Sequence, residues 1–272
     1  MVRVTTTNRR EVLRAGAGLA AGGALAAGCG PGPAALPTGP ASAPVSPSPS
    51  AARASGRTEV TAQAAPAPRA YPGRPAQITH GPRTRPRVAL TFHGQGDPAL
   101  AHSLLGEAER HGARLTVLAV GTWLDEHPDI ARRILDGGHD LGNHTQRHAA
   151  VNAMSEADAR REITHCADRL RRLTGSIGTW FRPSRAPTAS PLVARLARAA
   201  GYPHVLSYDV DSLDYTRPGP AAVTRKVLAD VTNGSVVSLH FGYPGTVTAL
   251  PDILHELDRR GLRAVTTTEL LS

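Results

Sequence analysis

Two histidines four residues apart, His144 and His148, are the side chains of this sequence best suited to metal chemistry. Neutral imidazole is a common zinc ligand, and a catalytic zinc needs one or two more protein ligands beside an open position. Because histidines at this spacing also occur on many helix surfaces, the pair becomes informative only with its surroundings. Other polar residues that could share a cleft with it are His93, Arg182 and His240, each of which follows a short apolar segment.

Such apolar segments alternate with amphipathic ones through most of the chain. The strands that we expect cover residues 87–92, 115–120, 180–182, 205–210, 235–240 and 262–265. The expected helices cover residues 98–111, 129–135, 155–173, 191–200, 220–231 and 249–260. This alternation predicts an α/β fold with parallel strands and outer helices. Chemistry in such folds gathers at the C-terminal ends of the strands, where the polar residues named above lie.

Composition divides the chain at about residue 86. Residues 1–86 hold ten of the 31 basic residues but two of the 22 acidic ones, which leaves 21 basic against 20 acidic residues in 87–272. A near-neutral domain lacks the basic surface that nucleic-acid binding requires, so we expect no nucleic-acid partner. Residues 30–86 are rich in Pro, Ala and Ser and poor in large apolar residues, which predicts a disordered linker before a folded domain at 87–272.

Residues 1–29 have the layout of an export signal. Arg9 and Arg10 precede a short, weakly apolar run that ends in Ala-Ala-Gly-Cys at Cys29, and this run is too short and glycine-rich to span a bilayer. The start is similar to a twin-arginine signal and the end to a lipobox, although Ala26 stands where a lipobox usually has Leu. We therefore expect an exported protein of the cell envelope or medium, with membrane contact only through a possible lipid at Cys29. Cys166 lies on an apolar helical stripe and is expected in the core.

The segment around the histidine pair, GHDLGNHTQRH at residues 138–148, closely resembles the second motif of the polysaccharide deacetylases. This family is also called the NodB-homology domain or carbohydrate esterase family four. Four more segments resemble its other motifs in the family's order: VALTF at 88–92, FRP at 181–183, DSLDY at 211–215 and VSLH at 237–240. The resemblance covers about residues 87–272. It implies a distorted (β/α) barrel of seven or eight parallel strands.

The same resemblance implies a metal-dependent hydrolase that removes N- or O-acetyl groups from peptidoglycan, chitin oligomers or xylan. His144 and His148 would hold the metal, usually zinc, which polarises the acetyl carbonyl and activates water. His240 would be the general acid. Asp214 would orient His240, and Arg182 would orient a catalytic carboxylate.

Substrate contacts are expected from three further residues. By resemblance, Leu239 would help form the pocket for the acetyl methyl group. Tyr215 stands in the fourth motif and could stack on a sugar ring, and Arg185 could favour an acidic glycan. The expected partner is therefore an acetylated polysaccharide, bound by a monomer.

The first motif departs from the family. The family continues Thr-Phe with Asp-Asp-Gly-Pro, where the first Asp is the base and the second a metal ligand, but this chain has His93 and Gly94, with Asp97 later. In one interpretation His93 is the base, since an imidazole suits proton transfer near neutral pH, and Asp97 curls back as a metal ligand. In another, His93 is a third imidazole ligand and Asp97 the base. In a third, the site is inactive and the domain is a glycan-binding cell-wall lipoprotein.

Overall fold

The computed structural model describes residues 65–272, and its sheet is centred on β2 (Arg87–Gly94). The run VALTF of this strand is buried on both faces, as expected for a central strand of a parallel sheet. β2 pairs in parallel with β3 (Thr116–Ala119) on one side and with β7 (Val236–His240) on the other. β4 (Asp140–Asn143) flanks β3, and β6 (Val210–Asp211) flanks β7, so the order is β4-β3-β2-β7-β6.

Smaller pairings extend this sheet toward a barrel. β1 (Gln77–Ile78) pairs with β5 (Val205–Leu206), and β8 (Arg263–Ala264) pairs with the first residues of β2. Single parallel bridges join Asn143 to Phe181 and Phe181 to Val205, which carries the hydrogen bonding from β4 to β5. No ladder joins β5 to β6 within residues 65–272. The predicted α/β fold with parallel strands is confirmed, with a barrel that its hydrogen bonds leave open.

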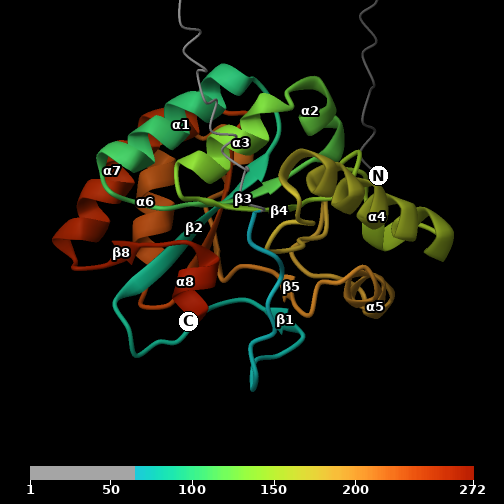
Figure 1. Cartoon of the computed structure of the whole chain (residues 1–272). Coiled ribbons are helices and arrows are strands. Elements are labelled where there is room, and N and C mark those ends of the chain that lie inside the picture. The colour runs from blue at the N-terminus through green and yellow to red at the C-terminus, as the bar shows by residue number, and fades with distance from the viewer. Residues whose placement is uncertain (1–64) are drawn as a thin grey trace, which may run out of the picture. The chain divides into compact units, whose positions relative to one another are not determined.

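Helices cover the strands on two sides (Figure 1). One group is α1 (Pro98–Arg110), α6 (Pro220–Asp230) and α7 (Pro244–Arg259). The other is α4 (Glu156–Thr174) and α5 (Pro191–Ala199), with α3 (Asp129–Asp136) between the groups. The predicted helices are confirmed to within a few residues, except that α7 begins five residues early at Pro244, where proline is favourable in a first helical turn.

The boundaries of α4 have clear causes. The Ser155 hydroxyl accepts a hydrogen bond from the Asp158 amide at the helix start, and Gly175 adopts a left-handed φ of 78° at its end. Cys166 is buried on the inner face, as predicted, and burial raises the pKa of its thiol. An inert core cysteine follows from this.

The remaining differences concern short elements. The predicted strand 205–210 is split into β5 and β6, and residues 180–182 contribute a single bridge. Four short helices were not predicted: α2 (Gly121–Glu126), α8 (Thr267–Leu271), and the 3₁₀ turns η1 (Val151–Ala153) and η2 (Asp214–Thr216). None of the helices within residues 65–272 combines the length and apolar character needed to cross a bilayer.

Residues 65–86 pack against the domain instead of forming the disordered linker that we expected there. The Tyr71 ring stacks on Trp180 with 5.5 Å between centroids, and the Tyr71 amide donates to His204 Nε2 at 3.0 Å. Ile78 is 1% exposed. The prediction from composition was wrong here because two apolar side chains, Tyr71 and Ile78, are enough to hold the segment on the domain. Tyr71 packs on Trp180, and the strand that contains Ile78 pairs with β5. The predicted leader, with Cys29, lies outside the described residues.

Replacing Ile78 by Ala should therefore destabilise the domain. Loss of a buried isoleucine typically lowers the free energy of unfolding by about 2–5 kcal/mol. The exposed residue Arg69 lies in the same segment, so Arg69→Ala is the matched control and should change little. Urea unfolding of both variants checks this, and equal stability of the two would contradict the packing of this segment.

Candidate active site

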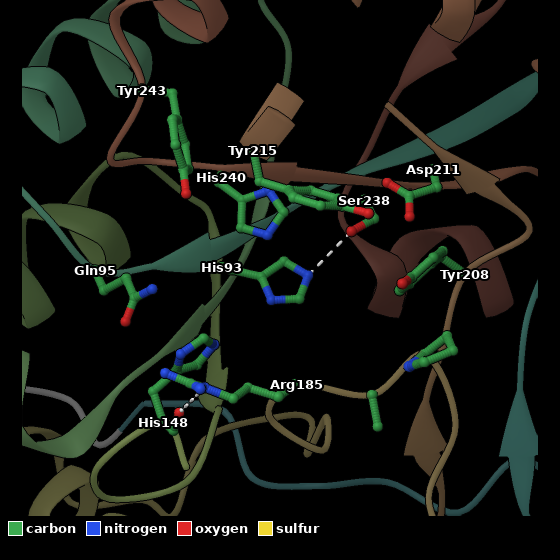
Figure 2. A pocket seen from close by; sticks show the side chains of 12 residues that line it. His93, Gln95, His148, Arg185, Tyr208, Asp211, Tyr215, Ser238, His240 and Tyr243 are labelled. Atoms are coloured by element: carbon green, nitrogen blue, oxygen red, sulfur yellow. Dashed lines mark hydrogen bonds between the residues drawn. The ribbon is translucent and has the colours of Figure 1, made fainter. Parts of the chain in front are cut away.

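Parallel pairing of β2 with β7 places two histidines side by side. His93 on β2 is the register partner of His240 on β7. Their rings stack with 4.3 Å between centroids and an interplanar angle of 20°. Figure 2 shows His93 in the middle of a cleft, between His240 and His148. The expected convergence of polar residues at the strand ends is therefore present.

Three histidines form a cluster with metal-ligand geometry. One nitrogen from each of His93, His144 and His148 lies within 4.8 Å of the other two. His93 Nδ1 is 2.7 Å from His144 Nε2. His144 Nδ1 donates to the Arg182 carbonyl oxygen at 3.0 Å, which leaves the Nε2 lone pair for a ligand. This donor set, three imidazoles around an open cleft, fits a catalytic zinc site.

The surroundings hold the three histidines in the neutral form that binds metal. Burial is the main cause that lowers the pKa of His93 and of His144 well below the ordinary value, and neighbouring histidines add to it. Burial, then the positive charge of Arg185, lowers the pKa of His148 to about 4. Neutral imidazole offers a lone pair, so no proton has to leave before a cation binds near neutral pH.

The loop that carries His148 is strained and firmly anchored. Thr145 and His148 have left-handed φ angles of 68° and 54°, which non-glycine residues rarely adopt. Glu162, 1% exposed, accepts from the Arg147 amide at 2.8 Å and from its guanidinium Nε at 2.7 Å. Glu162 was not among the predicted residues, although an acidic residue on the apolar stripe of α4 is a usable signal. Arg185 Nε donates to the His148 carbonyl oxygen at 3.0 Å.

His240 is oriented by a buried carboxylate, as predicted. Asp214 Oδ1 accepts from His240 Nδ1 at 2.6 Å, and Oδ2 accepts from the His240 amide at 2.8 Å. The Thr246 hydroxyl donates to the same Oδ2 at 2.7 Å. These bonds fix the ring and leave His240 Nε2 as the nitrogen available to a ligand.

Arg182 differs from its expected role. Its side chain is fully buried and donates to the carbonyl oxygens of Leu206 at 3.2 Å and Ser207 at 3.0 Å. Its third nitrogen lies 3.5 Å from His93 Nε2, and burial lowers its pKa to about 10. Arg182 makes no ion pair with the acidic residues in 65–272. It faces an imidazole because His93 replaces the carboxylate that it was expected to orient.

Asp97 does not join the cluster of His93, His144 and His148, so the structure does not bring it to the position of a ligand or base. Its carboxylate caps α1, where Oδ1 accepts from the Ala99 amide at 2.8 Å, and its side chain is exposed. A free helix N-terminus attracts an aspartate strongly, and this preference decided its place. Gly94 cannot be replaced easily by a ligand either, since a Cβ there would lie 2.9 Å from Val117 Cγ1.

The cleft over the cluster has a volume of about 530 Å³. Arg185 and Tyr215 line it, together with Tyr208, Tyr243 and Asp211 (Figure 2). Its walls thus offer aromatic rings and charged groups of both signs, which suits a sugar ligand.

Leu239 was predicted to shape an acetyl pocket, but it is fully buried in the hydrophobic core. Successive side chains of a strand point to opposite faces, so Leu239 turns away while its neighbours Ser238 and His240 face the cleft. The same alternation, counted back from His240 in the sequence, could have identified Ser238 as a residue that faces the cleft.

A histidine cluster and an aspartate-oriented histidine thus lie together at the strand ends of this parallel α/β fold. The family model described as polysaccharide deacetylase matches residues 80–205. A peptidoglycan-N-acetylglucosamine deacetylase of Bacillus cereus is 30% identical over 191 residues, which cover 68% of each chain. The chain belongs to the polysaccharide deacetylase family, as the five motifs predicted.

A longer relative is the peptidoglycan-N-acetylglucosamine deacetylase PgdA of Listeria monocytogenes, 27% identical over 188 residues. The match covers 69% of this chain but spans only 39% of that relative.

Solved structures agree on the fold. A peptidoglycan N-acetylglucosamine deacetylase structure superposes with a TM-score of 0.68 at 26% identity, covering 72% of this chain and 92% of the other. A carbohydrate esterase family four pseudoenzyme from Bacillus anthracis gives a TM-score of 0.69 at 24% identity, covering 73% and 70%. The second likeness concerns the fold alone.

Acid should destabilise the metal-free protein. The buried histidines bind a proton more readily in the unfolded chain, where the pKa is near 6.5. Their contribution to stability is full above that pH and is lost as the pH falls toward about 4, the pKa of His148. Urea unfolding at about pH 7 and pH 5 should show this loss. His148→Gln should shrink the difference, whereas His102→Gln, at an exposed site, should not. An equal change in the free energy of unfolding between the two pH values in both variants would contradict this account.

Proposed function

We propose that this chain is a metal-dependent deacetylase that removes acetyl groups from an N-acetylated polysaccharide such as peptidoglycan or chitin oligomers, with O-acetylated glycans as the other option. The observation that carries this proposal is the cluster of His93, His144 and His148 beside the His240–Asp214 pair. The peptidoglycan-N-acetylglucosamine deacetylase activity for which relatives are named supports the substrate class.

Zinc is the metal that the donor set favours, with three imidazoles as ligands. When bound, it would polarise the acetyl carbonyl and activate water. This arrangement follows the interpretation in which His93 is a ligand. The base then has to come from elsewhere, because Asp97 lies outside the cleft-lining residues.

His240 is the group best placed for both proton transfers. Its Nε2 would take a proton from the attacking water and return it to the leaving amine, while Asp214 stabilises the imidazolium. Arg185 and Tyr215 would contact the sugar from opposite walls of the cleft. Arg182, through its buried charge, would help to keep His93 neutral.

Residues 1–29 as an export signal, and a lipid at Cys29, remain proposals. Relatives named as peptidoglycan deacetylases support an envelope or extracellular location. The proposal is completed by a monomer with its catalytic domain at residues 87–272, against which residues 65–86 pack.

A second candidate is a glycan-binding protein without activity. It is favoured by one observation: the first motif supplies His93 and Gly94 where the family has two carboxylates. Acetate release from chitin oligomers or peptidoglycan distinguishes the deacetylase from the binding protein. A binding protein would bind the glycan and release no acetate, and a chelator would not change its glycan binding.

Metal content tests the ligand set. His93→Ala and His148→Ala should lose bound zinc because each removes one of three imidazoles. Asp97→Ala should keep the zinc and lose about 1 kcal/mol of stability through the missing helix cap. His102→Ala is the matched control at an exposed position. The zinc content of each purified protein is measured. Loss of zinc from Asp97→Ala alone would overturn this ligand set.

Asp214→Asn tests the proton-transfer pair. The amide cannot stabilise an imidazolium, so acetate release should fall by about 10²-fold or more while zinc stays bound. Asp252→Asn changes an exposed carboxylate on α7 and serves as control. Undiminished acetate release by Asp214→Asn would remove His240 from the proposed role.

A further inference from the structure

The hydrogen bonds around His93 define where its ring proton lies. His144 Nδ1 faces a carbonyl oxygen, which only accepts, so this nitrogen carries the proton of neutral His144. His144 Nε2 is therefore bare, and the 2.7 Å contact needs a proton on His93 Nδ1. His93 Nε2 is then an acceptor, and it lies 3.0 Å from the Ser238 hydroxyl, which donates to it.

Metal binding requires the opposite arrangement. The nitrogen of His93 that faces the other histidines is Nδ1, so the lone pair must be on Nδ1 and the proton on Nε2. Both His93 and Ser238 are buried, at 7% and 1% exposure, and an unpaired N–H there would be costly. The Arg182 guanidinium, 3.5 Å from Nε2, has no acceptor to offer. Only the Ser238 hydroxyl can pair with Nε2 in both states.

We propose that Ser238 is a positioning residue of the metal centre. By rotating from donor to acceptor, its hydroxyl stabilises the tautomer of His93 with the proton on Nε2 and so presents Nδ1 to the metal. The charge of His93 stays the same in this change. The inference rests on the three-histidine centre proposed above.

The neighbourhood of Ser238 allows this rotation. Ser238 and Tyr208 both line the cleft, so the Ser238 hydroxyl faces open space into which its proton can turn when it leaves His93 Nε2. Ser238 also lies one residue from Leu239 and two from His240 on β7, so the strand fixes its position.

Zinc titration calorimetry on the full chain tests the role. Ser238→Ala should bind zinc about 10–100-fold more weakly than the wild type, the usual effect of losing a hydrogen-bond partner of a metal ligand. Ser238→Thr keeps the hydroxyl and should restore most of the affinity. Ser207→Ala is the matched control, since Ser207 is equally buried and its hydroxyl donates to the Pro187 carbonyl oxygen instead. Thermal unfolding should show all three variants folded.

The ¹⁵N chemical shifts of the His93 ring give a second readout. Without metal, the proton should be on Nδ1, and with zinc it should be on Nε2. Wild-type affinity in Ser238→Ala, with zinc still lost from His93→Ala, would overturn the role of Ser238 and leave the three-histidine centre intact. Failure of the wild type to bind zinc, or a proton that stays on Nδ1 with zinc bound, would overturn both.

Discussion

The parallel register of β2 and β7 is the constraint on which the site depends. It places His93 against His240 and, two residues earlier on β7, brings Ser238 to the same face. A slip of β7 by one residue would turn Ser238 and His240 into the core, because strand side chains alternate between faces. The buried apolar residues of both strands prevent this slip. The register that packs the hydrophobic core is therefore also the register that forms the cleft.

At the centre of the cleft, an imidazole takes the place of a carboxylate. His93 stands where the family has an acid, and the buried cation Arg182 is left facing a neutral ring. The three imidazoles of the cluster are neutral, while Asp214 lies behind His240 and Asp211 lines the cleft. A metal bound there would keep its full charge, which favours activation of water and would make the site receptive to anions.

Anchoring of the loop behind the cluster shows how the fold supports a strained ligand. The left-handed φ of His148 persists because Glu162 holds the neighbouring Arg147 and Arg185 holds the His148 carbonyl. Asp97, in contrast, was free to cap α1, since nothing in the strand-end loop draws it back. Carboxylates thus cap a helix, anchor a loop and orient His240, while three imidazoles form the cluster.

The sequence by itself determined the α/β alternation, the family and the pair of His144 and His148, because periodicity and short motifs are local properties. It also placed His240 with Asp214. Only the tertiary structure decided that His93 completes the cluster, that Asp97 leaves it, and that residues 65–86 pack on the domain. Those outcomes depend on register, on competition for a helix cap and on surfaces that distant segments create, none of which a linear pattern records.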